Sequence, residues 1–192
     1  MGLTDKERET YESMWAVNAY SDYSPGEANL PIFLDMVGNM RGTVLDAGCG
    51  SGKGALALQQ HGFVPTLLDL TPAGLMDDAR HLPFIEKPLW SDLHRSVPKH
   101  DWVYCCDVLE HIPPTFTMLV VSRLLEVSRR GVFLTISLVQ DQFGVWIGTS
   151  LHQTIQPFGQ WKEQLSTLAP IYECRDLIDT GVFLLIPPIT HD

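Results

Sequence analysis

Glycine recurs at every second position after an acid in the stretch Val44–Gly54, which reads VLDAGCGSGKG. Asp46 comes first, and Gly48, Gly50 and Gly52 follow it. A glycine-rich turn between a strand and a helix presents backbone N–H groups and the positive end of the helix dipole to a ligand. The pattern therefore predicts a loop that wraps a nucleotide-containing cofactor.

Two common loops of this kind do not fit the spacing. A P-loop ends in Gly-Lys-Ser/Thr, whereas Lys53 is followed by Gly54, which leaves no hydroxyl to hold magnesium. A dinucleotide fingerprint that starts at Gly48 needs its third glycine at position 53, where the chain has Lys53. That third glycine lets the helix pack closely on the strand, so a dinucleotide is disfavoured as well.

The loop resembles motif I of the class I S-adenosylmethionine-dependent methyltransferases. The resemblance continues through the stretches LLDL, WSDL and CCDVLEHIPP and covers roughly residues 42–140. It implies S-adenosylmethionine as the cofactor and S-adenosylhomocysteine as the product. DVLEHIPP stands where amine methyltransferases of nucleic acids carry an NPPY-type motif, so the sequence is similar to the small-molecule and ubiquinone-type branch.

The methionine end of that cofactor carries a carboxylate and an ammonium but no phosphate. Backbone N–H groups of the loop are expected to bind the carboxylate. The Asp46 carboxylate and the neighbouring carbonyls are expected to bind the ammonium. The residues implied at this end are Asp46, Ala47, Gly48, Cys49, Gly50 and Gly52.

Two further acids end apolar runs that are expected to be strands. Asp69 follows the loop by about twenty residues, where such folds place the acid that binds the ribose hydroxyls. We expect Asp69 and Leu70 to contact the cofactor. Asp107 ends the run before Val108, and ligands of parallel sheets lie at the carboxyl ends of strands. Asp107 and Val108 are therefore expected beside the cofactor too, with a purely structural role for Asp107 as the alternative.

The resemblance implies an acid that accepts a hydrogen bond from the adenine amino group. Asp92 in WSDL is the expected residue, and the N–H of Leu93 would reach a ring nitrogen. The alternative is Asp78 with Ala79 in DARHLPF. Asp92 is favoured because KPLW makes the better third strand.

Methyl transfer from a sulfonium is an in-line displacement, so alignment of the reactants supplies much of the rate. A base is needed only where the acceptor must lose a proton. His111, beside Glu110, and His152 in a long later loop are the candidate bases, because imidazole titrates near neutrality. No metal is expected, because the adjacent Glu110 and His111 cannot easily face one ion from a strand end.

Aromatic residues are frequent in the segment WAVNAYSDYSPGE near the N-terminus. In similar enzymes this segment lies across the cofactor, which makes Tyr20, Tyr23 and Ser24 candidates to touch the acceptor or the methionine end. Packing against the core is the alternative for these rings.

Apolar runs alternate with amphipathic stretches, which predicts a Rossmann-like three-layer α/β sandwich. The expected sheet has seven strands and is mostly parallel, with an antiparallel C-terminal strand. The expected strands cover residues 43–48, 64–70, 87–93, 101–112, 131–138, 171–177 and 181–188. We expect one domain, residues 1–192, with an N-terminal helical cap (1–40), a cofactor-binding core (41–138) and a substrate-side part (139–192).

The formal charge of −10 argues against nucleic acid as a partner, because a phosphate backbone requires a basic face. No apolar run reaches the length of a membrane span, and the charged N-terminus does not resemble a secretory signal. The four cysteines form no CxxC pair, which indicates free thiols in a reducing cytoplasm. The sequence predicts methylation of a small molecule, with oxygen as the expected acceptor atom. A nucleic-acid or protein methyltransferase and a non-catalytic cofactor-binding domain are the alternatives, and the oligomeric state stays open.

Overall fold

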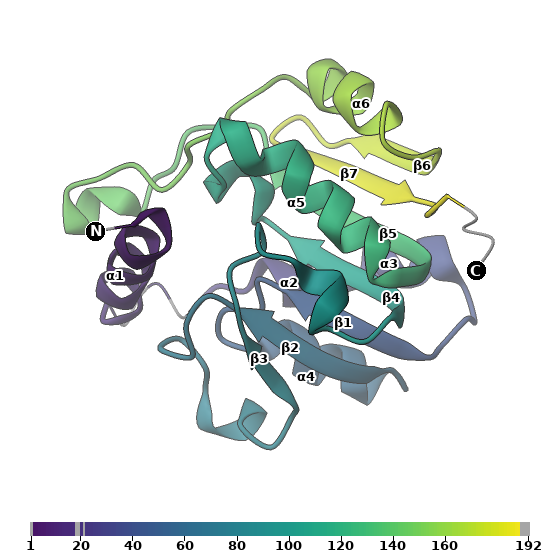
Figure 1. Ribbon diagram of the computed structural model, residues 1–192, viewed down its shortest axis with the longest axis horizontal. Coiled ribbons are helices and arrows are strands. Elements are labelled where there is room, and N and C mark those ends of the chain that lie inside the picture. The colour runs from purple at the N-terminus through teal and green to yellow at the C-terminus, as the bar shows by residue number, and fades with distance from the viewer. Residues whose placement is uncertain (1, 18–19, 21, 189–192) are drawn as a thin grey trace.

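The computed structural model describes residues 2–17, 20 and 22–188 of the chain. Seven strands form one sheet (Figure 1). The strands are β1 (Thr43–Ala47), β2 (Val64–Asp69), β3 (Phe84–Glu86), β4 (His100–Cys106), β5 (Ser128–Ser137), β6 (Ile171–Asp176) and β7 (Thr180–Leu185). The α-helices are α1 (Leu3–Trp15), α2 (Pro25–Ala28), α3 (Leu30–Val37), α4 (Lys53–Gln60), α5 (Pro114–Glu126) and α6 (Phe158–Ser166).

The strand order is β3-β2-β1-β4-β5-β7-β6. The pairs among β1 to β5 are parallel, whereas β7 runs antiparallel to both of its neighbours, β5 and β6. The predicted Rossmann-like sheet is therefore confirmed. The chain leaves β1 toward β2 on one side and returns to β4 on the other, so β1 and β4 flank the switch point where ligands bind in such sheets.

Both faces of the sheet are covered, and β4 shows how its sequence serves both. Trp102 and Tyr104 pack on the side of α3, while Val103 and Cys105 pack on the side of α5. Phe33 of α3 lies 5.1 Å from the Tyr104 ring and 5.9 Å from the Trp102 ring, measured between centroids. An apolar strand without polar alternation is what a doubly covered parallel sheet requires.

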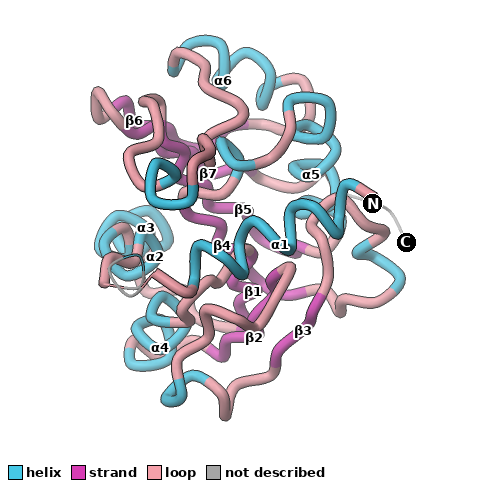
Figure 2. The backbone as a smooth tube through the Cα atoms, turned by 90° about the vertical axis from the view of Figure 1, so that its left-hand side faces the viewer, coloured by secondary structure: helices cyan, strands magenta, loops and turns pink. Residues whose placement is uncertain are grey.

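Helix α1 does not cover a face of the sheet. It crosses the end of the sheet at which β1, β2 and β4 finish (Figure 2). It touches the short 3₁₀ turn at Gly144–Ile147 in the loop after β5. The first helix and the loop after β5 therefore meet above the carboxyl ends of the strands. Among the described residues, no helix combines the length and apolar character that a membrane crossing requires.

Two of the expected strands differ in the structure. The third strand is Phe84–Glu86 rather than the KPLW stretch, because these residues pair with Leu67–Asp69 of β2. The fifth strand, expected to begin at residue 131, already begins at Ser128. Between β2 and β3 the chain forms a 3₁₀ turn at Asp77–Ala79.

Candidate functional site

Two adjoining cavities open at the carboxyl ends of β1, β2 and β4. The larger has a volume of about 350 Å³ and the smaller about 110 Å³. Both are lined by Trp15, Tyr20, Gly48, Gly50, Asp107 and His111. The two cavities are therefore parts of one continuous site that runs across the glycine loop.

The glycine loop has no room for a side chain at two of its positions. Gly48 has a φ of 77°, and a Cβ there would lie 2.5 Å from a methyl group of Val108. Gly52 has a φ of 78°, and a Cβ there would lie 2.6 Å from the Cβ of Ala79. Only glycine combines a left-handed backbone with such close approach. The spaced glycines thus bring the loop against the end of β4 and against the 3₁₀ turn after β2.

Several N–H groups of the loop already donate within the protein. Gly48 and Cys49 donate to the Leu68 carbonyl at 2.8 and 3.2 Å, and Gly52 donates to Cys49. Gly50 donates to the Asp69 carboxylate at 2.8 Å. These four N–H groups hold the loop in shape, so a bound carboxylate would have to use other donors.

Asp46 is buried near the end of β1 and lines the larger cavity. Burial, followed by the nearby Asp69 charge, raises the pKa of Asp46 to about 7. The backbone N–H of Ala55, in the first turn of α4, opposes this shift by bonding to the carboxylate. A cation brought next to Asp46 would favour its ionised form.

Asp69 ends β2 and lines the smaller cavity. Its carboxylate accepts the N–H groups of Gly50 and Leu70 at 2.8 and 2.6 Å. Burial raises the pKa of Asp69, and the backbone donors at Gly50, Leu70 and Thr71 counteract the rise. The predicted ribose acid and Leu70 are both found in the cavity lining.

Asp107 lines both cavities and has a left-handed backbone with a φ of 51°. Its carboxylate accepts the Thr135 hydroxyl at 2.8 Å, and its N–H donates to the Thr135 carbonyl at 2.9 Å. Strained backbone of this kind persists where neighbours hold it and is common at functional sites. Asp107 therefore has a structural role and a place at the site, and Val108 lies beside it in the smaller cavity.

The structure does not bring Asp92 and Leu93 to the site. The Asp92 carboxylate pairs with His94, Arg95 and Arg123 at 3.0 to 3.2 Å, and Leu93 is buried in the core beside α5. This placement argues against the predicted adenine contact. The alternative residue Asp78 is exposed and does not line either cavity, while Ala79 packs under the glycine loop.

Three residues that follow β3 line the smaller cavity instead: Pro88, Leu89 and Trp90. These residues were not predicted to bind the cofactor, because the third strand was expected over this stretch. The contribution of α1, whose Tyr11 and Trp15 line the same cavity, was not predicted either. A Cβ on Gly50 would lie 2.9 Å from the Trp15 ring, and one on Gly74 would lie 2.4 Å from it. The run of aromatics along one face of α1 was the signal for this contact.

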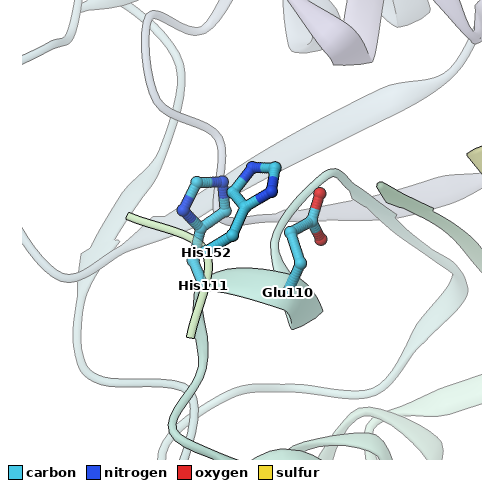
Figure 3. Close-up of side chains that lie close together, drawn as sticks. All are labelled: Glu110, His111 and His152. Carbon is cyan, nitrogen blue, oxygen red and sulfur yellow. The ribbon is translucent and has the colours of Figure 1, made fainter. Parts of the chain in front are cut away.

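The predicted bases His111 and His152 come together in the larger cavity. Their ring centroids lie 4.7 Å apart with the planes at 90° (Figure 3). Burial, followed by the His152 charge, lowers the pKa of His111 to about 3. His111 is therefore neutral over the physiological range and is a weak base.

The predicted acceptor-side residues Tyr20, Tyr23 and Ser24 also line the larger cavity. Tyr20 packs between Trp15 and Phe143, with centroid distances of 4.7 and 5.9 Å. Burial raises the pKa of Tyr20, so its hydroxyl stays protonated. The loop after β5 is shaped by Asp141, which accepts the N–H groups of Phe143, Gly144 and Leu151.

Acidic side chains dominate the charge of the two cavities. The larger is lined by Asp46, Asp107 and Asp141, and the smaller by Glu7, Asp69 and Asp107. Neither lysine nor arginine is among the described residues that line them. Such a lining favours a cationic ligand and disfavours phosphate groups.

Solved structures share this architecture over most of the chain. The complex of DhpI with S-adenosylhomocysteine has a TM-score of 0.75 at 17% identity and covers 97% of each chain. The 1,6-didemethyltoxoflavin-N1-methyltransferase of Burkholderia thailandensis has a TM-score of 0.71 at 14% identity, covering 98% of this chain and 92% of that one. The chain shares the Rossmann-like α/β fold of these methyltransferases. The magnesium protoporphyrin IX methyltransferase of Synechocystis PCC 6803, solved with S-adenosylmethionine, has a TM-score of 0.63 at 15% identity, covering 98% and 85%.

The sequence comparison is narrower. The chloroplastic magnesium protoporphyrin IX methyltransferase of Arabidopsis thaliana is 30% identical over 99 residues, which are 48% of this chain and 32% of that protein. The match therefore spans about a third of the length of this curated relative. No family model matches the chain.

Proposed function

We propose that this protein is an S-adenosylmethionine-dependent methyltransferase that acts on an oxygen atom of a small molecule. One observation carries the proposal. A half-buried acid at the end of β2, Asp69, accepts a hydrogen bond from the glycine loop. The cavity that Asp69 lines continues into a larger one that is lined by two histidines. The fold shared with methyltransferases that were solved with cofactor or product supports it.

The smaller cavity suits the adenosine part of the cofactor. Asp69 would accept the ribose hydroxyls there. Apolar walls for the adenine ring come from Leu70, Leu89, Trp90 and Val108. The methionine part would cross the glycine loop to Asp46, whose carboxylate attracts the ammonium. The acidic lining also suits the positive sulfonium.

The larger cavity would then hold the acceptor. In the reaction, an acceptor oxygen attacks the methyl carbon, the C–S bond breaks, and its electron pair moves to sulfur. The positive charge of the sulfonium is thereby neutralised and S-adenosylhomocysteine is formed. A hydroxyl proton would pass to His152 rather than to His111, because burial makes His111 a weak base.

The acceptor pocket is built by two segments outside the cofactor core. Tyr20, Tyr23 and Ser24 come from the N-terminal part, which we assign to a helical cap at residues 1–40. Val139 to Phe143, Leu151 and His152 come from the substrate-side part at residues 139–192. A pocket of about 350 Å³ fits a small molecule and not a polymer surface.

Small molecules are also the named substrates of the relatives, magnesium protoporphyrin IX for one and 1,6-didemethyltoxoflavin for another. The net charge of −10 and the acidic cavities argue against nucleic acid. We place the protein in a reducing compartment such as the cytoplasm, because Cys49, Cys105, Cys106 and Cys174 are free thiols.

Calorimetry followed by an acceptor panel tests the proposal. S-adenosylmethionine and S-adenosylhomocysteine should each bind with one site per chain. Formation of S-adenosylhomocysteine should then rise with a hydroxyl compound from a panel of hydroxyl, carboxyl and amine compounds. No binding at millimolar cofactor would refute the function. Binding without turnover on any acceptor would favour a non-catalytic cofactor-binding domain, and turnover with amines alone would exclude the oxygen acceptor.

A further inference from the structure

Three side chains with metal-ligating atoms meet beside the larger cavity. Glu110, His111 and His152 each offer one ligand atom, and these atoms all lie within 4.8 Å of one another (Figure 3). Glu110 and His111 belong to a 3₁₀ turn at Leu109–His111, and His152 belongs to the loop after β5. The proposed reaction does not use the Glu110 side chain.

In each of the two imidazoles, the Nδ1 atom lies beside a backbone carbonyl, which fixes the ring and leaves the Nε2 atom for a ligand. The Nδ1 atom of His111 lies 3.2 Å from the Leu151 carbonyl, and that of His152 lies 2.7 Å from the Val139 carbonyl. A carbonyl can only accept, so each Nδ1 carries the proton in the neutral ring. Each Nε2 then keeps a free lone pair. Backbone carbonyls fix metal-ligating histidines in this way in many metal sites.

The surroundings of the Glu110 carboxylate also indicate a bound cation. Its side chain is fully buried, and one carboxylate oxygen accepts the Ser137 N–H at 2.9 Å. The other oxygen, Oε2, is buried without a hydrogen-bond partner among the described residues. A buried carboxylate oxygen without a partner costs free energy that a cation would offset.

The turn explains why adjacent residues can serve one ion. Successive side chains of a strand point to opposite faces, which was the reason to expect no metal. Glu110 and His111 lie beyond the end of β4, where this alternation no longer applies. The Glu110 carbonyl also accepts the N–H groups of Gln153 and Thr154 at 2.7 and 2.9 Å, which fixes His152 beside the turn.

We propose that Glu110, His111 and His152 bind a divalent transition-metal ion such as zinc at the acceptor side of the larger cavity. Two imidazoles and one carboxylate form a ligand set typical of catalytic zinc. For bonds of about 2.0–2.2 Å, ligand atoms around a tetrahedral ion lie roughly 3.3–3.6 Å apart. The three side chains therefore need only modest rotation to close on an ion. Asp107 and Asp141 lie close enough to His152 to interact with its charge and add negative potential.

The ion would act on the acceptor in the proposed methyl transfer, and this part rests on that function. A fourth position, open to the cavity, would take an acceptor oxygen. Binding to the ion lowers the pKa of that oxygen, so a hydroxyl loses its proton to water. In the metal-bound protein this route replaces proton transfer to His152, because the Nε2 lone pair of His152 is then bound to the ion. The resulting alkoxide attacks the methyl carbon, and the electron pair of the C–S bond moves to sulfur. A carboxylate acceptor could bind in the same way and would have no proton to lose.

Metal binding to the full chain tests the inference without turnover. Equilibrium dialysis against zinc should give one ion per chain, and cobalt should give the visible absorption of a tetrahedral site. His152→Ala and Glu110→Gln should each weaken zinc binding at least tenfold. His61→Ala is the matched control, because His61 is an exposed histidine whose Nδ1 also lies near a carbonyl.

Each outcome separates the two proposals. Less than a tenth of an ion per wild-type chain, or equal binding by the His152→Ala variant, would overturn the metal site. His152 lies in a loop at the surface of the cavity, so this variant should fold even where Glu110→Gln does not. Cofactor binding measured on the same samples shows whether the methyltransferase function holds. If the protein binds the cofactor but no metal, only the metal-site proposal is refuted. If it binds metal but no cofactor, the proposed methyltransferase function is refuted.

Discussion

The Asp69 carboxylate accepts the Gly50 N–H at 2.8 Å, so the end of β2 is tied to the loop that follows β1. The same carboxylate accepts the N–H of Leu70 through its other oxygen at 2.6 Å. Each carboxylate oxygen can accept more than one hydrogen bond, so both keep capacity for the hydroxyls of a ribose. Asp69 thus shapes the glycine loop and also offers the site a half-buried hydrogen-bond acceptor.

Replacing Asp69 by alanine should weaken S-adenosylmethionine binding by about 10- to 100-fold. Hydrogen bonds to a charged group contribute roughly 1.5–3 kcal/mol each, and about 1.4 kcal/mol corresponds to a factor of ten. Calorimetry on the folded variant measures the change. Asp78→Ala is the control, because Asp78 is exposed and lies outside both cavities. An unchanged dissociation constant for Asp69→Ala would contradict the ribose role.

The raised pKa of Asp46 predicts a pH dependence of cofactor affinity. In the free protein Asp46 titrates at about 7 because it is buried near Asp69. The ammonium of the cofactor favours the ionised carboxylate and lowers this pKa on binding. The complex therefore binds fewer protons than the free protein below pH 7, and affinity should fall as the pH falls from about 7.5 to 5.5. The slope can reach tenfold per pH unit for one group.

Calorimetry across this range measures the effect, and Asp46→Asn supplies the control. The amide keeps the shape of the side chain but does not titrate there, so its affinity should be lower and nearly independent of pH. The stability of the free protein depends on pH in the opposite direction to the cofactor affinity. A carboxyl whose pKa is raised by folding binds more protons in the folded state, so stability should fall as the pH rises from about 4 to 7. A wild-type affinity that is flat from pH 5.5 to 7.5 would show that Asp46 does not bind the ammonium.

Gly48→Ala should destabilise the protein and abolish cofactor binding, because the new Cβ would lie 2.5 Å from a Val108 methyl group. Gly148→Ala is a matched control, since Gly148 is left-handed with a φ of 74° but nothing lies within 4 Å of the Cβ position. Both variants incur the left-handed cost of about 1–2 kcal/mol, and Gly48→Ala adds the clash. Thermal unfolding and calorimetry should show a larger loss for Gly48→Ala, with binding retained by Gly148→Ala. Equal losses would mean that the close approach to Val108 is unimportant.

The predicted cofactor-binding residues that line the two cavities share a local signature. The glycine loop, Asp46 and Asp69 each follow directly from a buried strand, and a strand end in a parallel sheet has a fixed place relative to the site. Their positions depend on the fold class and on a few neighbouring residues. Because these neighbouring residues are close in the sequence, one sequence is enough to predict where the site residues lie.

The residues that were missed or misplaced depend on packing between distant segments. Strand β3 has three residues and pairs only with β2, so its pattern could not be told from that of KPLW a few residues later. Because the third strand was expected at KPLW, the adenine contact was predicted at Asp92. Trp15 reaches the glycine loop only because α1 packs across the strand ends. The spacing of Tyr11 and Trp15 places both rings on one face of α1, but it does not specify what that face packs against.

The correction around β3 leads to a final prediction about the adenine pocket. Trp90→Ala should weaken S-adenosylmethionine and adenosine binding by about tenfold or more, because the indole lines the smaller cavity and an aromatic wall contributes roughly 1–3 kcal/mol to a stacked base. Asp92→Ala should leave both affinities within about twofold, because its carboxylate pairs with arginines and a histidine outside the cavity. The Asp92→Ala substitution should instead lower the free energy of unfolding by roughly 1 kcal/mol or less, because it removes a partly exposed ion-pair network. Calorimetry and thermal melts on the two variants decide the matter. A large loss of affinity in Asp92→Ala with none in Trp90→Ala would restore the acid as the adenine partner.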